Sequence, residues 1–169
     1  MDEQRQLLCH FLAGLAYRTQ KALRGAPPEF ASFRAAPGVR TPHEIVFHMT
    51  DVLAAVRWRF VGEAWRPHRT ETFEEEVVRF HETLQELGQH LVWGTPLHGT
   101  TPETILQGPL SDAMTHAGQL AMLRRFFGDP VPPEDFMEAN VDADNLGPEQ
   151  PEPACPDEEW PDAEGSSKT

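Results

Sequence analysis

The sequence has few of the features that would assign it to several common classes of protein. Its two cysteines, Cys9 and Cys155, lie in unrelated contexts, so no zinc-type or redox-type cysteine pair is indicated and reduced thiols are expected. No window approaches the roughly 18 uninterrupted apolar residues of a membrane span, and the N-terminus has no basic-then-apolar export signal. We therefore expect a cytoplasmic protein that does not act at a membrane.

Basic residues are also scarce. The 14 lysines and arginines stand against 27 acidic residues, which gives a formal net charge of −13. The excess lies in residues 129–169, with thirteen acids and one base, whereas residues 1–128 are nearly neutral. Because the chain has no basic stripe, nucleic acid is not an expected partner. The length of 169 residues, 39% of them hydrophobic, suits one domain with a core rather than two.

Four segments do show the three- and four-residue spacing of apolar positions that is typical of amphipathic helices. They span about residues 3–23, 42–60, 73–91 and 102–127. Thr41-Pro42-His43-Glu44 and Thr101-Pro102-Glu103 are start signals, with a capping threonine before a proline at the first helical position. Pro109 should kink or restart the last helix. The pattern predicts an all-α protein, a four-helix bundle.

Beyond Pro130 the helical period is lost. We expect an extended C-terminal arm whose main apolar anchors are Phe136 and Met137, which makes residues 1–147 one domain. Residues 148–169 are acidic and rich in proline, with Trp160 as the only large apolar group, and this tail is expected to be disordered.

Three residues stand out as candidate metal ligands. His48 occupies a core-facing position in the apolar stripe of the second helix, and Asp112 and His116 are four residues apart, on one face of the fourth. Two imidazoles and one carboxylate are a ligand set that several divalent metals accept, with a position left open for water or substrate. Taken singly, His48 could equally be a core histidine bonded to a backbone or hydroxyl group, and Asp112 could cap the helix that restarts after Pro109.

The remaining titratable residues have plainer interpretations. Glu74, Glu75 and Glu76 are expected to be a solvated first turn that complements the helix dipole. His43 should be a more exposed first-turn residue. The histidines of the third helix, His81 and His90, should lie on the surface beside its packing seam.

Two segments carry a resemblance to a known family. Residues 41–51, Thr-Pro-His-Glu-Ile-Val-Phe-His-Met-Thr-Asp, and residues 111–120, Ser-Asp-Ala-Met-Thr-His-Ala-Gly-Gln-Leu, in that order and distance, resemble the DinB/YfiT-like superfamily of metalloenzymes. The resemblance covers roughly residues 1–147 and implies a four-helix bundle that holds a divalent metal through three side chains. Carried over by position, these are His48, Asp112 and His116. The family usually has histidine where this chain has Asp112.

The resemblance also implies a function. The characterised members that this chain resembles are thiol S-transferases and isomerases, which use a low-molecular-weight thiol of the bacillithiol type and an electrophilic small molecule. Members of the superfamily often form homodimers. Zinc or nickel is the expected metal, with manganese or iron as alternatives. Gln119 and Glu44, each one turn from a ligand, are candidates for orienting an imidazole or a water. The alternatives are a metal-dependent hydrolase and a non-enzymatic, stress-related dimeric bundle that binds a ligand, with Trp58 and Trp65 available for a dimer interface.

Overall fold

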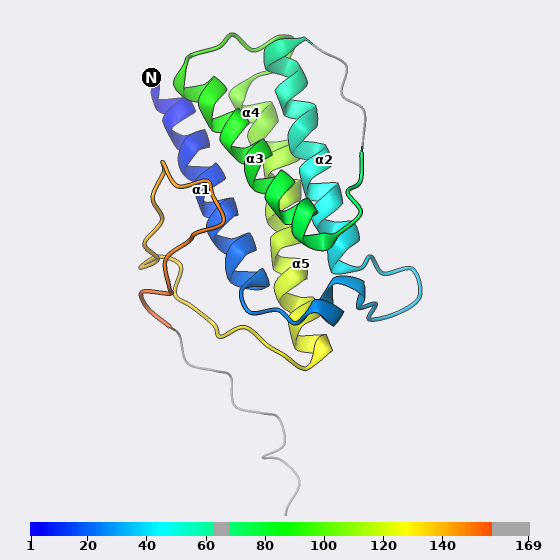
Figure 1. Cartoon of the computed structure of the whole chain (residues 1–169). Coiled ribbons are helices and arrows are strands. Elements are labelled where there is room, and N and C mark those ends of the chain that lie inside the picture. The colour runs from blue at the N-terminus through cyan, green and yellow to red at the C-terminus, as the bar shows by residue number, and fades with distance from the viewer. Residues whose placement is uncertain (63–67, 157–169) are drawn as a thin grey trace, which may run out of the picture.

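The computed structural model describes residues 1–62 and 68–156, and within these ranges the protein is all-helical (Figure 1). The described residues form no strand; Glu134 and Pro156 make an isolated bridge. The helical elements, in chain order, are α1 (Glu3–Leu23), the 3₁₀ turn η1 (Pro28–Ser32), α2 (Pro42–Val61), α3 (Phe73–Val92), α4 (Pro102–Ile105), the π turn η2 (Leu106–Leu110) and α5 (Ser111–Phe127). None of these helices is both long enough and apolar enough to cross a membrane.

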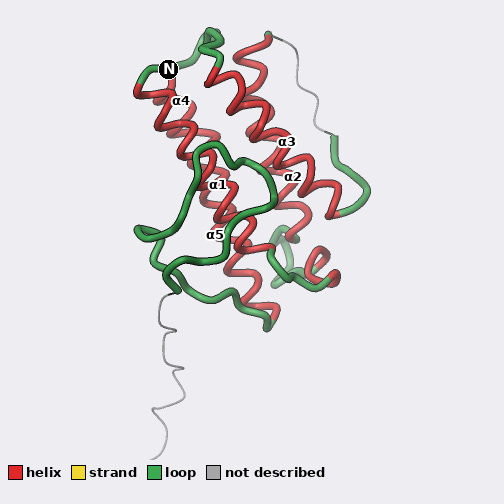
Figure 2. Tube along the Cα trace, turned by 60° about the vertical axis from the view of Figure 1, so that its left-hand side comes forward, coloured by secondary structure: helices red, strands yellow, loops and turns green. Residues whose placement is uncertain are grey.

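The four long helices pack around one core. Helix α1 contacts α3 and α5, and α2 contacts the same two helices, so each helix has two long neighbours (Figures 1 and 2). The side chains between them are buried and mostly aliphatic, and burial of this apolar surface is the main stabilising contribution. The largest fully buried residues include Leu12, Tyr17, Phe30, Met49, Phe80 and Leu120. The predicted all-α class is confirmed.

The predicted helix boundaries also agree closely with the structure. Thr41 accepts a hydrogen bond from the backbone N–H of Glu44, whose carboxylate accepts one from the backbone N–H of Thr41, so both halves of a capping box are present. Gly128 ends α5 at φ 88°, a left-handed conformation that glycine adopts without strain. The start and stop signals in the sequence therefore act where they were expected to act.

The region around Pro109 is helical, but its turn is wider than an α turn. The chain passes from α4 through η2 into α5, with Pro109 inside the π turn. Proline lacks a backbone N–H and clashes with the carbonyl four residues earlier, and the wider turn relieves this conflict. The hydroxyl of Ser111 donates to the carbonyl of Leu106 at 2.7 Å. The prediction that the helix restarts here is thus replaced by a local widening of one turn.

The C-terminal arm returns along α1 (Figures 1 and 2), and one of its two expected anchors, Phe136, packs against that helix. Met137 is 90% exposed, so it is no anchor, whereas Phe136 packs edge-on against Tyr17. Leu146 is buried, and its carbonyl accepts a hydrogen bond from Nδ1 of His81 at 2.9 Å. The expectation that His81 lies on the surface is therefore wrong, because the arm covers it.

Cationic side chains of the helices bind the backbone of the arm and of the tail. The guanidinium of Arg24 donates to the carbonyls of Gln150 and Pro151, and it pairs with Glu152 at 2.7 Å. Lys21 donates to the carbonyl of Pro132. The expectation of disorder from residue 148 onward is therefore wrong for residues 148–156. Residues 157–169, Trp160 included, and Trp65 lie outside the described residues.

Two residues near the N-terminal ends of α2 and α3 are more buried than expected. Glu76 is fully buried and accepts hydrogen bonds from Thr70 and Arg79, so only Glu74 and Glu75 of the acidic run are solvated. His43 is also buried, and its ring lies edge-on to Phe73. Both residues were expected to be exposed. The segment before α3 covers them, and helical period does not report contacts of that kind.

Candidate metal centre

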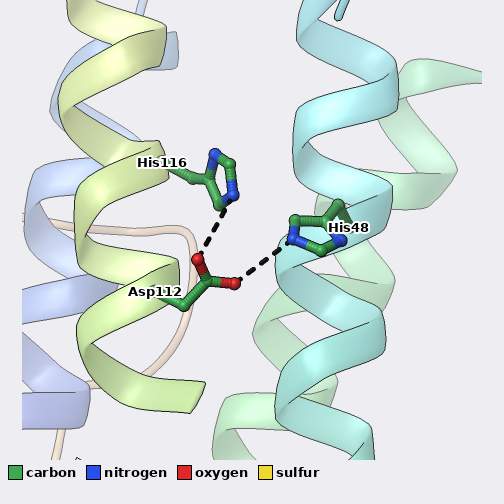
Figure 3. A group of neighbouring side chains, drawn as sticks. All are labelled: His48, Asp112 and His116. Carbon is green, nitrogen blue, oxygen red and sulfur yellow. Dashed lines mark ion pairs between the residues drawn. The ribbon is translucent and has the colours of Figure 1, made fainter. Parts of the chain in front are cut away.

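His48, Asp112 and His116 meet between α2 and α5 (Figure 3). Nε2 of His48 lies 3.2 Å from Oδ2 of Asp112, and Nε2 of His116 lies 3.6 Å from Oδ1 of the same carboxylate. The three prospective ligand atoms all lie within 4.8 Å of one another. The two imidazole rings are nearly perpendicular, at 89°, with centroids 4.8 Å apart. The side chains therefore converge on one point from two helices.

The helices place these side chains in different environments. His48 follows the buried Ile45 on α2, but it lies at the edge of the apolar stripe with 28% of its side chain exposed. His116 is nearly buried on α5, and Asp112, one turn earlier, is 46% exposed. One side of the group thus faces the core and the other remains accessible, as an open metal site requires.

Asp112 does not cap a helix. The residue at the cap position of α5 is Leu110, which makes no side-chain cap bond, and the backbone before it is already helical. Because the π turn continues α4 into α5, the amides near Asp112 do not form a free helix terminus. The carboxylate instead points toward the two histidines. The capping interpretation of Asp112 is therefore not the one that the structure adopts.

Gln119 holds the ring of His116. Its Oε1 lies 2.7 Å from Nδ1 of His116, and because an amide oxygen accepts, this contact favours the tautomer with the proton on Nδ1. In that tautomer the lone pair is on Nε2, the atom that faces Asp112 and His48. This is the usual arrangement around a ligating histidine, in which a neighbouring acceptor fixes the tautomer.

The pKa of His48 is lowered. Burial is the largest cause, followed by the positive charge of Arg40 and by the repulsion that protonated forms of His48 and His116 would exert on each other, while Asp112 acts in the opposite direction. The imidazole of His48 is therefore neutral at neutral pH and has a lone pair to offer. A metal ligand must be deprotonated in this way.

The donor set fits a divalent cation. In a tetrahedral site with bonds of ~2.1 Å, neighbouring ligand atoms lie about 3.4 Å apart. The distances from the two histidines to Asp112, measured to its two different oxygens, lie near this value, and the three ligand atoms spread over no more than 4.8 Å. The carboxylate would balance part of the charge of the ion, and three protein ligands leave coordination positions open. The group could hold a metal ion.

Two cavities include candidate ligands in their linings. The first, of about 790 Å³, lies against α2, α4 and the π turn; its lining includes Asp112 and Thr115, several further hydroxyl side chains and Arg59. The second, of about 820 Å³, lies between α5 and the segment 33–40, and its lining includes His116 and Gln119. Each volume suits a small-molecule ligand. Both linings are mostly apolar, and one candidate ligand belongs to each.

Glu44, the other residue expected to orient a ligand, is engaged elsewhere. Its carboxylate accepts the backbone N–H of Thr41 and pairs with Arg34 at 3.1 Å. The hydrogen bond from the backbone of Thr41 is the largest cause of its lowered pKa. Glu44 thus fixes the loop before α2. Arg40, in that loop, was not among the candidates, because nothing in its sequence context marks it.

Comparisons of the chain with protein-family models, with curated proteins and with solved structures found no match. The function is therefore argued from the residues and their geometry.

Proposed function

We propose that this protein is a divalent-metal-dependent thiol S-transferase with a DinB-like four-helix bundle, and that His48, Asp112 and His116 are its metal ligands. The observation that carries the proposal is the convergence of these three donors, two of which, Asp112 and His116, each line a cavity. A transferase of this kind needs one site for the thiol and another for the electrophile, both open to the reacting sulfur. Gln119 is proposed as the residue that orients His116.

Zinc or nickel suits the two imidazoles best, and the carboxylate of Asp112 extends the range to manganese and iron. When bound, the ion would lower the pKa of a thiol, so that a thiolate is available at neutral pH. The side chains around the ion then act on the two substrates. The hydroxyl groups and Arg59 in the first cavity can bind the polar part of a low-molecular-weight thiol of the bacillithiol type.

The transfer step can be written with its atoms balanced. The sulfur of the thiolate attacks the electrophilic carbon, a C–S bond forms, and the bond from that carbon to the leaving group breaks. The leaving group departs with the electron pair, and the thiol proton goes to solvent. No oxidant or reductant is needed.

The two-cavity arrangement favours transfer over the related alternative, hydrolysis by a metal-activated water. A hydrolase needs room for one substrate, whereas here two cavities of similar volume each include a proposed ligand in their lining. The proposal also includes a homodimer, which light scattering on the purified protein tests. Trp58, which was considered for a dimer interface, is half-exposed in the lining of the first cavity, with Arg59 over its ring.

Metal binding is the first test of the proposal. Zinc, nickel and manganese are added in turn to metal-free protein, and binding is followed by calorimetry and by the melting temperature. We expect stoichiometric binding and a raised melting temperature, both lost in His48→Ala and His116→Ala. His98→Ala is the matched control, since His98 is an exposed loop residue. Binding that survives His116→Ala would show that the site is misplaced, and failure of every metal to bind would overturn the enzyme proposal.

The second test measures the reaction. Zinc-loaded protein is mixed with chlorodinitrobenzene and with bacillithiol or cysteine, and the thioether product is followed by absorbance. We expect metal-dependent conjugation that saturates with both substrates. In a parallel assay the protein is given an ester. Hydrolysis of that ester without formation of the thioether would instead support the hydrolase alternative and overturn the transferase proposal.

A further inference from the structure

The second cavity has a composition that selects a particular kind of molecule. Its walls are apolar over most of their extent, with Ile45 and Leu123 at the buried side and Phe33, Met122 and Phe126 toward solvent. Among the described residues that line it, Arg40 is the only one with a full charge, and none is acidic. A cavity of this kind suits a ligand with an apolar body and a single negative group.

Arg40 is available for such a group. Its neighbour Arg34 is engaged by the carboxylate of Glu44 and by the carbonyl of Val39. Within the described residues, by contrast, Arg40 has no hydrogen-bond or ion-pair partner. A guanidinium presents several N–H donors in a plane that matches a carboxylate or a sulfonate.

The loop that carries Arg40 is fixed in place rather than free. Arg34 ties its ends together, and the capping box of Thr41 and Glu44 anchors it to α2. On the other side Phe33 packs edge-on against Phe127 of α5. The backbone at Arg40 is therefore held in place, which lowers the entropic cost of binding an anion there.

The cavity also reaches the candidate metal centre. His116 and Gln119 form part of its lining, and Arg40 is close enough to His48 for its charge to be felt there. A molecule bound in this cavity lies beside the point where the three ligands converge. Arg40 can therefore bind the anionic end of a substrate while another part of that substrate meets the thiolate.

We propose that the cavity between α5 and the segment 33–40 is the electrophile site, and that it selects substrates with an apolar body and one carboxylate or sulfonate, bound by Arg40. The identification of the bound molecule as the electrophile rests on the proposed transferase function. The binding preference itself depends only on the cavity, so it can be tested without metal and without turnover.

The experiment compares two fluorescent probes of similar shape on the metal-free full-length protein. Anilinonaphthalene sulfonate carries one negative charge, and N-phenylnaphthylamine is neutral. In Arg40→Gln we expect the affinity for the sulfonate to fall roughly five- to tenfold, with the affinity for the neutral probe unchanged. Added salt should weaken sulfonate binding to the wild type and have little effect on the variant.

Two further variants locate the effect. Arg125→Gln removes the same charge from an exposed position on α5 that does not line this cavity, and it should bind both probes as the wild type does. Phe126→Ala removes an exposed apolar wall and should weaken both probes alike. Circular dichroism of each variant checks that the helices are intact.

The outcomes separate this inference from the proposed function. If Arg40→Gln binds the sulfonate as tightly as the wild type, or loses both probes equally, or behaves as Arg125→Gln does, the anion site is refuted even where metal binds. If Arg40→Gln loses the sulfonate alone while no metal binds, the anion site stands and the transferase proposal fails.

Discussion

Replacement of Gln119 tests the centre most sharply, because it perturbs the site without replacing a proposed ligand. Gln119 is exposed, and its amide oxygen accepts from Nδ1 of His116 at 2.7 Å. In Gln119→Leu this acceptor is lost. The proton of the neutral ring can then move to Nε2, the atom that faces Asp112, and the ring is free to reorient. Metal-free protein should lose no more than about 1.5 kcal/mol of its free energy of unfolding, the net value of one hydrogen bond.

Metal affinity should change more than stability does. Loss of an acceptor behind a ligating histidine typically costs 10- to 100-fold in affinity, which is about 1.4–2.7 kcal/mol. Gln119→Glu keeps an acceptor at the same position and should bind metal at least as tightly as the wild type. Gln89→Leu makes the same change at an exposed position of α3 and serves as the control.

The assay is a competition for zinc between each variant and a chromophoric chelator at neutral pH. We expect Gln119→Leu to bind zinc more weakly than the wild type, whereas Gln119→Glu and Gln89→Leu should bind zinc with normal or improved affinity. An affinity of Gln119→Leu within about twofold of the wild type would refute this expectation, since the tautomer of His116 would then not depend on this hydrogen bond.

Three further predictions concern other parts of the structure. Asp112→Asn should weaken zinc binding, measured in the same competition. The free energy of unfolding of the metal-free protein should fall by less than about 1 kcal/mol, because the exposed carboxylate is no helix cap. A larger loss of stability with unchanged zinc affinity would contradict this prediction. Tyr17→Phe removes the donor to the buried carboxylate of Glu134 and should cost about 1–3 kcal/mol in denaturant unfolding, and a cost near zero would show that the pair is not formed. Burial lowers the pKa of His81, so the unfolded state binds more protons below about pH 6.5, and stability should fall as the pH falls through this range. His81→Gln, which can still donate to Leu146, should reduce that slope by up to about 1.4 kcal/mol per pH unit, and equal slopes would exclude His81 as its source.

Much of the fold could be predicted because it is encoded locally. The four long helices follow from apolar spacing, and their ends follow from residues such as Thr41 and Gly128 that act within one turn. The three candidate ligands could be named for a similar reason, since His48 interrupts an apolar stripe and Asp112 and His116 share a helical face.

The parts that could not be predicted depend on contacts between distant segments. His81 is buried because the arm brings Leu146 over it, and Glu76 is buried because Thr70 and Arg79 enclose it. The period of α3 contains no information about either partner. Arg40 is a similar case, because its importance lies in a cavity formed by a loop and a helix that are far apart in the sequence.

The π turn at Pro109 bears on one of the choices that the sequence left open, the role of Asp112. From the sequence alone, a proline just before Asp112 was compatible with a new helix start, and therefore with a capping aspartate. The helix instead continues through the wider turn. That continuity removes the free amides that a cap would serve, and it leaves Asp112 for the two histidines.

The way in which the arm is attached to α1 has a consequence for how its sequence can vary. Arg24 and Lys21 donate to main-chain carbonyls of Gln150, Pro151 and Pro132, so these contacts require a carbonyl and not a particular side chain. At these positions the arm can therefore exchange its side chains and keep its course, whereas the donors on the helix are fixed. In a collection of random variants, tolerated substitutions should be common at Gln150, Pro151 and Pro132 and rare at Arg24 and Lys21, and also rare at the arm residues whose own side chains are buried, Glu134 and Leu146. The acidic C-terminal region thus offers positions where a label or a fusion can be attached with little effect on the centre between α2 and α5.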